Sequence, residues 1–280
     1  MKTLRYIQSA IFILIFSMTA CTEKIDVTLD NTYTRLVVDA VITSDTTVHS
    51  VKLSTTTDYF SNQVAPAVSN AIVTISDGTT TVTLKENTVR PGVYETENTF
   101  YAVPGKTYKL NITLATAINN KTNYEAISEM DDVAPLDSIK LMTIQQWDVT
   151  AIQTYAQDPI SVNFYMFKAY INHVLISDTL NEVFITDDKL FNGSYTNGIA
   201  ASYLDQKKPD EKIKAGDTVT LQIAGITSQY YNFLVDVSSS TGFSNPLFGG
   251  PPANVRGNIS NGAIGFFSAY SVHYASIVAR

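Results

Sequence analysis

The sequence predicts a mainly β protein built from two β-sandwich domains, the first immunoglobulin-like and the second containing a single helix. Three observations carry this prediction. β-branched and aromatic residues are abundant, with 16 Tyr and 13 Phe in 280 residues, as expected of strands. Short segments of alternating polarity are separated by turn residues at the spacing of a sandwich. Only one convincing segment has apolar residues at helical spacing.

The first domain is expected over residues 32–130. Its clearest signal is Asp77-Gly78 between two β-forming segments, a dipeptide that predicts a tight hairpin. A second turn at Pro104-Gly105 precedes a segment in which apolar and polar residues alternate, as in a strand with one buried face. The strands expected in this domain cover residues 35–43, 48–54, 71–76, 80–86 and 107–114.

The second domain, residues 131–280, begins after an acidic connector that contains Pro135. A helix is expected over residues 228–238, capped by Ser228 and carrying an apolar stripe. Residues 187–210 are polar and predict a loop, and residues 241–262 form a long Gly/Pro/Asn-rich loop. The strands expected here begin at residue 138 and include residues 161–173, its pairing partner 179–186, then 218–223 and the closing strand 263–275.

The N-terminus predicts a lipoprotein signal peptide over residues 1–20. Lys2 and Arg5 precede an apolar core that is too short to span a bilayer, and small residues then lead to Cys21, the sole cysteine of the chain. We expect cleavage before Cys21 and acylation of its thiol, with residues 21–31 as a tether. The alternative is an ordinary signal peptide followed by a cysteine that stands there by chance.

Lipid on Cys21 predicts attachment to the outer membrane, because more than one acyl chain anchors a protein stably. Glu23 and Asp26 follow the cysteine closely and favour a surface-facing over a periplasmic orientation. Loss of Lys2 and Arg5 with the signal peptide takes the net charge from −7 to −9. Such an acidic chain has no electrostatic footprint for nucleic acid. A single cysteine also excludes internal disulfides and cysteine-rich metal clusters.

The C-terminal third carries a recognisable pattern in residues 230–234 (Tyr-Tyr-Asn-Phe-Leu), in the Asn/Pro-rich residues 245–255, and in residues 257–272 with their Gly-Asn-Ile-Ser-Asn-Gly start. This pattern resembles the DUF4249 family of bacterial outer-membrane lipoproteins, whose domain has no known function. More generic β-domain segments match at residues 36–40, 71–78 and 104–108. The resemblance implies a lipoprotein often encoded beside a TonB-dependent transporter, and it implies no catalytic residue and no cofactor.

The sequence contains no catalytic signature, so we expect a non-enzymatic protein. Its three histidines, His49, His173 and His273, are far apart in the chain and stand in expected strands, which favours ordinary strand residues over a metal site. Asp187 and Asp188 are candidates for Ca²⁺ because this ion takes oxygen ligands. Their spacing matches no known calcium loop, and a solvated acidic turn is the simpler interpretation.

The long loop 241–262 is the candidate binding segment. Its aromatic residues could contact a sugar or a partner protein, or they could fold inward and cap the domain. The expected function is accessory to TonB-dependent nutrient uptake, through ligand binding or docking on the transporter. A structural or adhesive surface module is the alternative, and a hydrolase is a weaker third. The candidate binding residues are Phe243, Asn245, Leu247, Phe248, Asn254 and Arg256.

Overall fold

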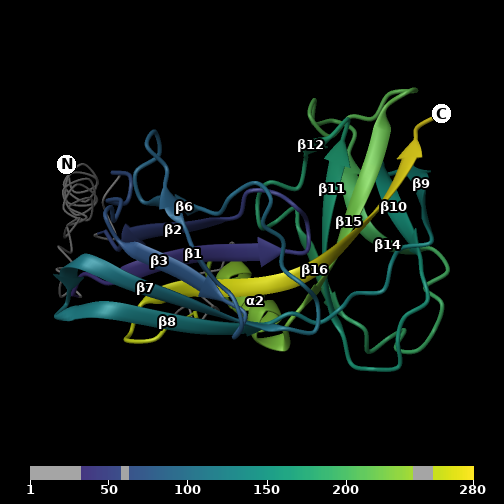
Figure 1. Ribbon diagram of the computed structural model, residues 1–280. Coiled ribbons are helices and arrows are strands. Elements are labelled where there is room, and N and C mark those ends of the chain that lie inside the picture. Colours follow the sequence, from purple (N-terminus) through teal and green to yellow (C-terminus); the bar gives the residue numbers. More distant parts are fainter. Residues whose placement is uncertain (1–32, 58–62, 242–254) are drawn as a thin grey trace, which may run out of the picture. The chain divides into compact units, whose positions relative to one another are not determined.

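The computed structural model describes residues 33–57, 63–241 and 255–280. The chain divides into two compact units, Met1–Tyr33 and Thr34–Arg280. All described strands and the described helix belong to the second unit, shown in Figure 1. Cys21 and five of the six candidate binding residues lie outside the described residues. The predicted fold class is confirmed: the chain is mainly β, with one α-helix among the described residues. Its immunoglobulin-like character stays a prediction.

The described strands form three sheets. The largest follows the order β12-β11-β15-β16-β1-β2-β6-β5, with β13 also paired to β11. It contains β1 (Leu36–Thr43), β2 (Ser50–Thr55), β5 (Lys85–Glu86), β6 (Val93–Glu95), β11 (Phe164–Ile171), β12 (Val174–Leu175), β13 (Phe184–Asp187), β15 (Thr218–Ile226) and β16 (Ile264–Val278). The two smaller sheets are β4 (Thr81–Thr83), β3 (Ile72–Ser76), β7 (Thr107–Ile118), β8 (Lys121–Glu129), and β14 (Ile199–Asp205), β10 (Val149–Tyr155), β9 (Ser138–Ile144).

The N-terminal core lies between the sheet β4-β3-β7-β8 and the part of the large sheet that contains β1 and β2. Strand β7 buries alternate residues, as its sequence predicts: Tyr108, Leu110, Ile112 and Leu114. A side chain that points into the core leaves its neighbours on the solvent face because the period of a strand is two. The hairpin around Asp77-Gly78 is also confirmed, since β3 and β4 pair across it.

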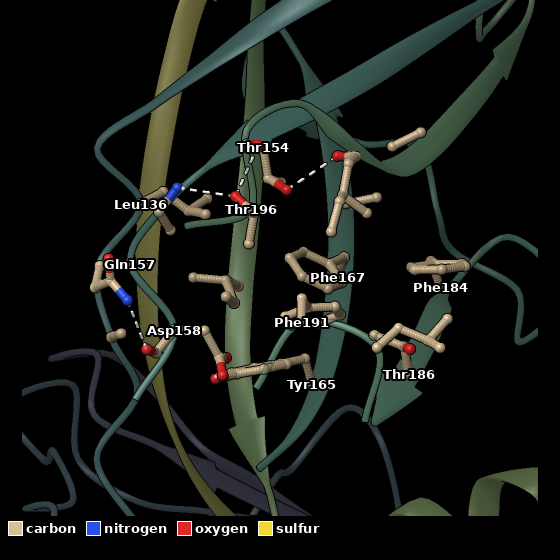
Figure 2. A pocket seen from close by; sticks show the side chains of 17 residues that line it. Leu136, Thr154, Gln157, Asp158, Tyr165, Phe167, Phe184, Thr186, Phe191 and Thr196 are labelled. Carbon is tan, nitrogen blue, oxygen red and sulfur yellow. Dashed lines mark hydrogen bonds between the residues drawn. The ribbon is translucent and has the colours of Figure 1, made fainter. Parts of the chain in front are cut away.

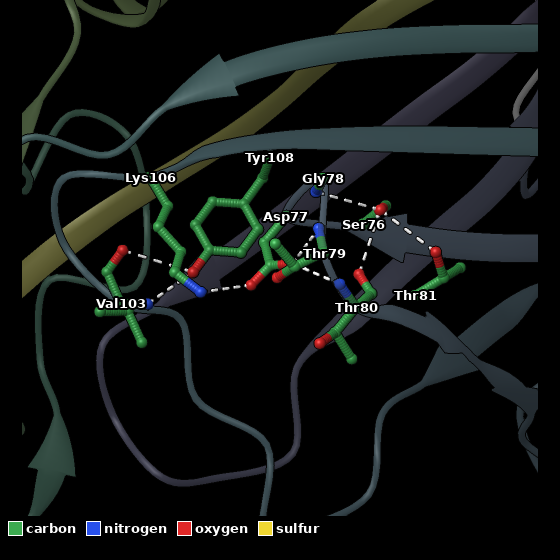
Figure 3. A network of polar contacts seen from close by, with 9 residues as sticks. All are labelled: Ser76, Asp77, Gly78, Thr79, Thr80, Thr81, Val103, Lys106 and Tyr108. Carbon is green, nitrogen blue, oxygen red and sulfur yellow. Dashed lines mark hydrogen bonds and ion pairs between the residues drawn. The ribbon is translucent and has the colours of Figure 1, made fainter.

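Asp77 fixes this hairpin through its side chain (Figure 3). One carboxylate oxygen accepts hydrogen bonds from the backbone N–H groups of Thr79 and Thr80, at 3.0 and 2.7 Å. The other accepts from the Lys106 ammonium, which follows the second predicted turn. The Lys106 ammonium and then these backbone and hydroxyl donors hold the pKa of the Asp77 carboxyl well below its usual range. The two predicted turns are therefore joined by one ion pair.

Strand β16 belongs to both halves of the large sheet. Its residues 264–270 run parallel to β1, and residues 271–278 run antiparallel to β15. In the sequence prediction the closing strand 263–275 belongs to the C-terminal domain alone. Gly265 pairs with Val38 of β1, with φ at +108° and room for no side chain: a Cβ atom would lie 1.8 Å from the Val38 carbonyl oxygen. One strand thus contributes side chains to the N-terminal core, to the core of the C-terminal half and to a third apolar cluster around Leu234.

Helix α2 (Ser228–Thr241) covers one face of the large sheet. The predicted stripe is confirmed, because Tyr230 and Phe233 pack on Phe266 with ring centroids 5.1 and 5.0 Å apart, and Leu234 is buried. The predicted N-cap is wrong by one residue. Thr227 rather than Ser228 caps the helix, since its hydroxyl accepts a 3.2 Å hydrogen bond from the Tyr230 N–H.

Two further expectations about secondary structure are wrong. Residues 187–210 contain strand β14, which pairs with β10 although its Ala-Ala-Ser core gives little hydrophobic signal. Ala201 and Leu204 are nevertheless buried. His173 lies in the tight β11–β12 turn rather than in a strand, with φ at +67°. Within the described part of the chain, no helix is long and apolar enough to cross a membrane.

Candidate functional site

Arg256, the described member of the predicted binding loop, has a structural contact. Its guanidinium pairs with Asp236 of helix α2, with Nε 3.0 Å from Oδ2 and Nη2 3.4 Å from Oδ1. The guanidinium holds the pKa of the Asp236 carboxyl below its ordinary value. This ion pair holds the loop at Arg256 against helix α2. Phe243, Asn245, Leu247, Phe248 and Asn254 lie outside the described residues.

The Gly-Asn-Ile-Ser-Asn-Gly segment at residues 257–262 covers the edge of β8. Asn258 Nδ2 donates to the Ile127 carbonyl at 3.1 Å, and Asn261 Nδ2 donates to the Asn123 carbonyl at 2.7 Å. Between them, Ser260 exchanges backbone and side-chain hydrogen bonds with Glu125. An open strand edge is a site of unwanted pairing, which side chains and loops commonly cover. Residues 257–262, which belong to the motif that carries the family resemblance, therefore have a structural role in covering this strand edge.

The weak calcium candidates, Asp187 and Asp188, are engaged in separate contacts. Asp187 pairs with Lys189 at 2.6 Å. Asp188 is fully buried, and its Oδ2 accepts a 2.7 Å hydrogen bond from the Asn163 N–H. Among the residues that the structure describes, no three His, Cys, Asp or Glu side chains gather as they would around a metal ion. The predicted calcium site has no geometric support in the described chain.

His49 and His173 lie in different local environments. His49 is buried, with Nδ1 accepting from the Thr43 N–H at 3.3 Å and Nε2 lying 3.1 Å from the Asp45 carbonyl oxygen. A neutral ring protonated on Nε2 satisfies both contacts. Burial lowers the pKa of the His49 imidazole. His49 is therefore a packed structural residue, whereas His173 is exposed in its turn.

An apolar pocket lies between the sheet β14-β10-β9 and the strands β11, β13 and β15. Its volume is about 300 Å³, at the lower end of the range for small-molecule sites. Figure 2 shows Phe167 and Phe191 near its middle, with Asp158 and Tyr165 toward one end and Thr154 and Thr196 toward the other. Its principal apolar walls come from Leu136, Phe167, Phe184, Phe191, Ile199 and Ile223.

Aromatic rings build one wall of the pocket. Tyr165 stacks on Phe191 with centroids 6.2 Å apart, and Phe167 meets Phe184 at 6.0 Å. Tyr165 and Phe167 are alternate residues of β11 and so point to the same face. Leu190, which also lines the pocket, is 97% exposed, while Phe167 is 6% exposed. The pocket thus runs from a solvent-facing rim to a buried aromatic wall.

Asp158 is the charged group of the pocket. Its Oδ1 accepts a 2.5 Å hydrogen bond from the Tyr165 hydroxyl, and its Oδ2 accepts a 3.1 Å bond from the Gly193 N–H. Burial raises the pKa of the Asp158 carboxyl, and the nearby charge of Asp188 adds to this. Hydrogen bonds from Tyr165 and Gly193 oppose the rise. Burial, and then Asp158 itself, raise the pKa of the Tyr165 hydroxyl.

The polar groups at the other end of the pocket already form hydrogen bonds within the protein. The Thr154 hydroxyl donates to the Ile199 carbonyl at 3.0 Å, and the Thr196 hydroxyl donates to the Thr154 carbonyl at 2.9 Å. At the Asp158 end, Gln157 donates to the Gly193 carbonyl at 3.1 Å. These hydrogen bonds connect neighbouring strands and loops of the pocket wall. Among the lining residues, Asp158 is the one with a charged side chain.

Sequence reasoning missed this pocket because its lining is spread over residues 134–223 in seven separate places. Tyr165 and Phe167 were visible as part of an aromatic strand, but which face they occupy depends on the pairing of β11 with β15. The remaining signal, Asp158 before Pro159, is a common dipeptide in loops. No local pattern marks Asp158 as a residue of a pocket.

The fold and the pocket define a mainly β protein whose C-terminal half encloses an apolar, acid-tipped cavity. The chain belongs to the family described as Domain of unknown function (DUF4249), whose model matches residues 22–275. The predicted family resemblance is thereby confirmed over nearly the whole chain. A comparison with curated proteins gave no match.

Proposed function

We propose that the chain is an outer-membrane lipoprotein, anchored through Cys21, that binds a small molecule with an apolar body and assists a TonB-dependent transporter without catalysing a reaction. The observation that carries the binding function is the pocket of about 300 Å³ with its aromatic wall. A dry cavity of about 150 Å³ accommodates a benzene molecule. On that scale the present pocket holds a ligand of about twelve non-hydrogen atoms.

The anchor is supported by the sequence, in which a short apolar core and small residues lead to the single cysteine. A lipid-anchored protein stays at the membrane surface, where a ligand held in its pocket can be passed to a transporter. The transporter is proposed as the partner because the family resemblance implies such a neighbour. Surface exposure is favoured by Glu23 and Asp26 close behind the cysteine.

The test is to isolate the acylated protein from outer membranes and to identify what accompanies it by mass spectrometry. We expect a TonB-dependent transporter and a small molecule with an apolar body. Ala200 lines the pocket and is half-buried, so Ala200→Phe fills the cavity from its side. This variant should lose the small molecule and keep the transporter. Ala117→Phe, at an exposed position of β7, is the matched control and should keep both.

Two results would contradict the proposal. Retention of the small molecule by a folded Ala200→Phe protein would place the ligand outside this pocket. Recovery of adhesion or secretion components in place of a transporter would favour the structural or adhesive alternative.

A further inference from the structure

Among the described residues, the buried carboxylate of Asp158 in the pocket has no positively charged partner. Asp158 is 4% exposed and lines the cavity, and the ion pairs among the described residues do not include it. The charged group that acts on it is Asp188, a second buried carboxylate. Lys189 also acts on Asp188, but its ammonium is mainly exposed and pairs with Asp187. Buried charges are normally paired, because an isolated one is costly to remove from water.

The hydrogen bonds of Asp158 leave acceptor capacity on both oxygens. Each carboxylate oxygen has two acceptor sites, and one donor is present at each: the Tyr165 hydroxyl at Oδ1 and the Gly193 N–H at Oδ2. Asp188 does not line the pocket, but its buried Oδ1 has no hydrogen-bond partner among the described residues, so a second carboxylate near Asp158 lacks a positive partner. A ligand that brings positively charged donors would therefore find acceptors at this end of the pocket.

The aromatic wall favours the same kind of ligand. Tyr165 lies near both Phe191 and Phe167, with ring centroids 6.2 and 6.3 Å away. Aromatic faces attract a cation within about 6 Å, more strongly when water is excluded. The far end of the pocket offers apolar side chains and hydroxyls that are already bonded. The site thus has a cation-attracting end and an apolar body.

We propose that the ligand of this pocket is a small amine, with a protonated nitrogen against Asp158 and an aromatic or aliphatic body against Phe167 and Phe191. This inference rests on the ligand-binding function proposed above and names its ligand class. An anion of the same shape would be repelled by Asp158 and Asp188. A neutral alcohol could donate a hydrogen bond to the carboxylate, but it would lack the positive charge that completes an ion pair with Asp158.

Three probes of nearly equal size test the ligand class: 2-phenylethylamine, 2-phenylethanol and phenylacetate, titrated calorimetrically into the full mature protein at pH 7. The amine should bind at least tenfold more tightly than the alcohol, as expected for a charge-assisted contact, and phenylacetate should bind least. Equal affinities for amine and alcohol would overturn the amine proposal while leaving a ligand pocket in place. Failure of all three to bind would count against both the ligand class and the binding function.

Asp158→Asn removes the charge and keeps the shape of the side chain. It should weaken 2-phenylethylamine binding at least tenfold and leave 2-phenylethanol binding unchanged. Asp178→Asn is the control, because it removes one exposed carboxylate that does not line the pocket; both affinities should stay at their wild-type values. An unchanged amine affinity in a folded Asp158→Asn protein would refute the role of Asp158. If that variant does not fold, the three-probe comparison on the wild-type protein decides the question.

Discussion

His49 shows how a single polar side chain is accommodated in the N-terminal core. Its ring touches Phe100 edge-on, with centroids 5.4 Å apart, and both ring nitrogens have backbone contacts. Protonation would place a second N–H against the Thr43 N–H, which is itself a donor. The fold is therefore compatible with the neutral ring and opposes the charged one.

This arrangement predicts a pH-dependent stability. Because burial lowers the pKa of folded His49 below the value of about 6.5 in an unfolded chain, the unfolded state binds the proton first. The contribution of His49 is complete above about pH 6.5 and falls on acidification, by at most about 1.4 kcal/mol per pH unit. Urea unfolding at pH 7.5, 6.5 and 5.5 should show this loss, and His49→Gln should reduce it. His173→Gln, at an exposed position, should leave the pH dependence of the free energy of unfolding unchanged.

The helix cap gives a second prediction for a single residue. Thr227→Ala removes the hydroxyl that accepts from the Tyr230 N–H and should lower the free energy of unfolding by about 1 kcal/mol. Ser228→Ala, one residue later and exposed, should change it by less than about 0.5 kcal/mol. Thermal or urea unfolding measures both. A larger loss from Ser228→Ala would restore the cap that the sequence predicts.

The sequence predicted residue types better than exact positions. Thr227 and Ser228 are both good capping residues, and which one caps depends on where β15 ends at Ile226. The Asp77-Gly78 turn was predictable because the two residues themselves determine it. The lysine that completes its network is 29 positions away, so only the fold brings them together.

At the level of elements, β16 is the strand that joins the two cores. Phe267 and Ala269 lie in the N-terminal core, whereas Ala275 and Ile277 pack against the C-terminal one. The hydroxyl of Ser128 accepts from the Ala269 N–H at 2.9 Å, and the Ser271 hydroxyl donates to the Asp131 carbonyl at 2.8 Å. A destabilising substitution in this strand should therefore destabilise both cores.

Gly265→Ala tests the coupling. The added Cβ would overlap the Val38 carbonyl and the backbone would be strained, so we expect a loss of more than about 3 kcal/mol, as for other severe backbone effects. Gly216→Ala has a comparable positive φ but open space around it, and should cost about 1 kcal/mol. Circular dichroism reports both cores, and fluorescence of the single Trp147 reports the β9–β10 turn.

In the Gly265→Ala protein the two signals should shift together in one transition. A Trp147 transition that stays at the wild-type urea concentration would show that the C-terminal core folds without β16. The sequence predicts the closing strand at residues 263–275, but it does not predict the strand's partners. Parallel pairing with β1 joins residues more than 220 positions apart. Strand β14 was also unpredicted, because its own sequence is weakly hydrophobic and it is stabilised by pairing with β10.

At the level of the whole molecule, the proposed anchor and the proposed pocket are separable. Cys21→Ala removes the site of acylation and leaves the identity of every described residue unchanged. The variant should therefore fold normally, bind its ligand, and appear in the soluble fraction or as unprocessed precursor. Fractionation followed by immunoblotting measures this. Wild-type levels of the mature Cys21→Ala protein in the outer membrane would disprove anchoring through this cysteine.

The central claim is that the cavity around Phe167 and Phe191 binds a small ligand. Methyl NMR spectra of the Ile- and Leu-labelled protein, titrated with 2-phenylethylamine, test it most directly. Saturable shifts are predicted for the pocket methyl groups of Leu136, Ile199 and Ile223, with those of Leu36, Ile42 and Ile112 in the N-terminal core unmoved. The absence of saturable shifts at the pocket, or equal shifts in both groups, would contradict the claim.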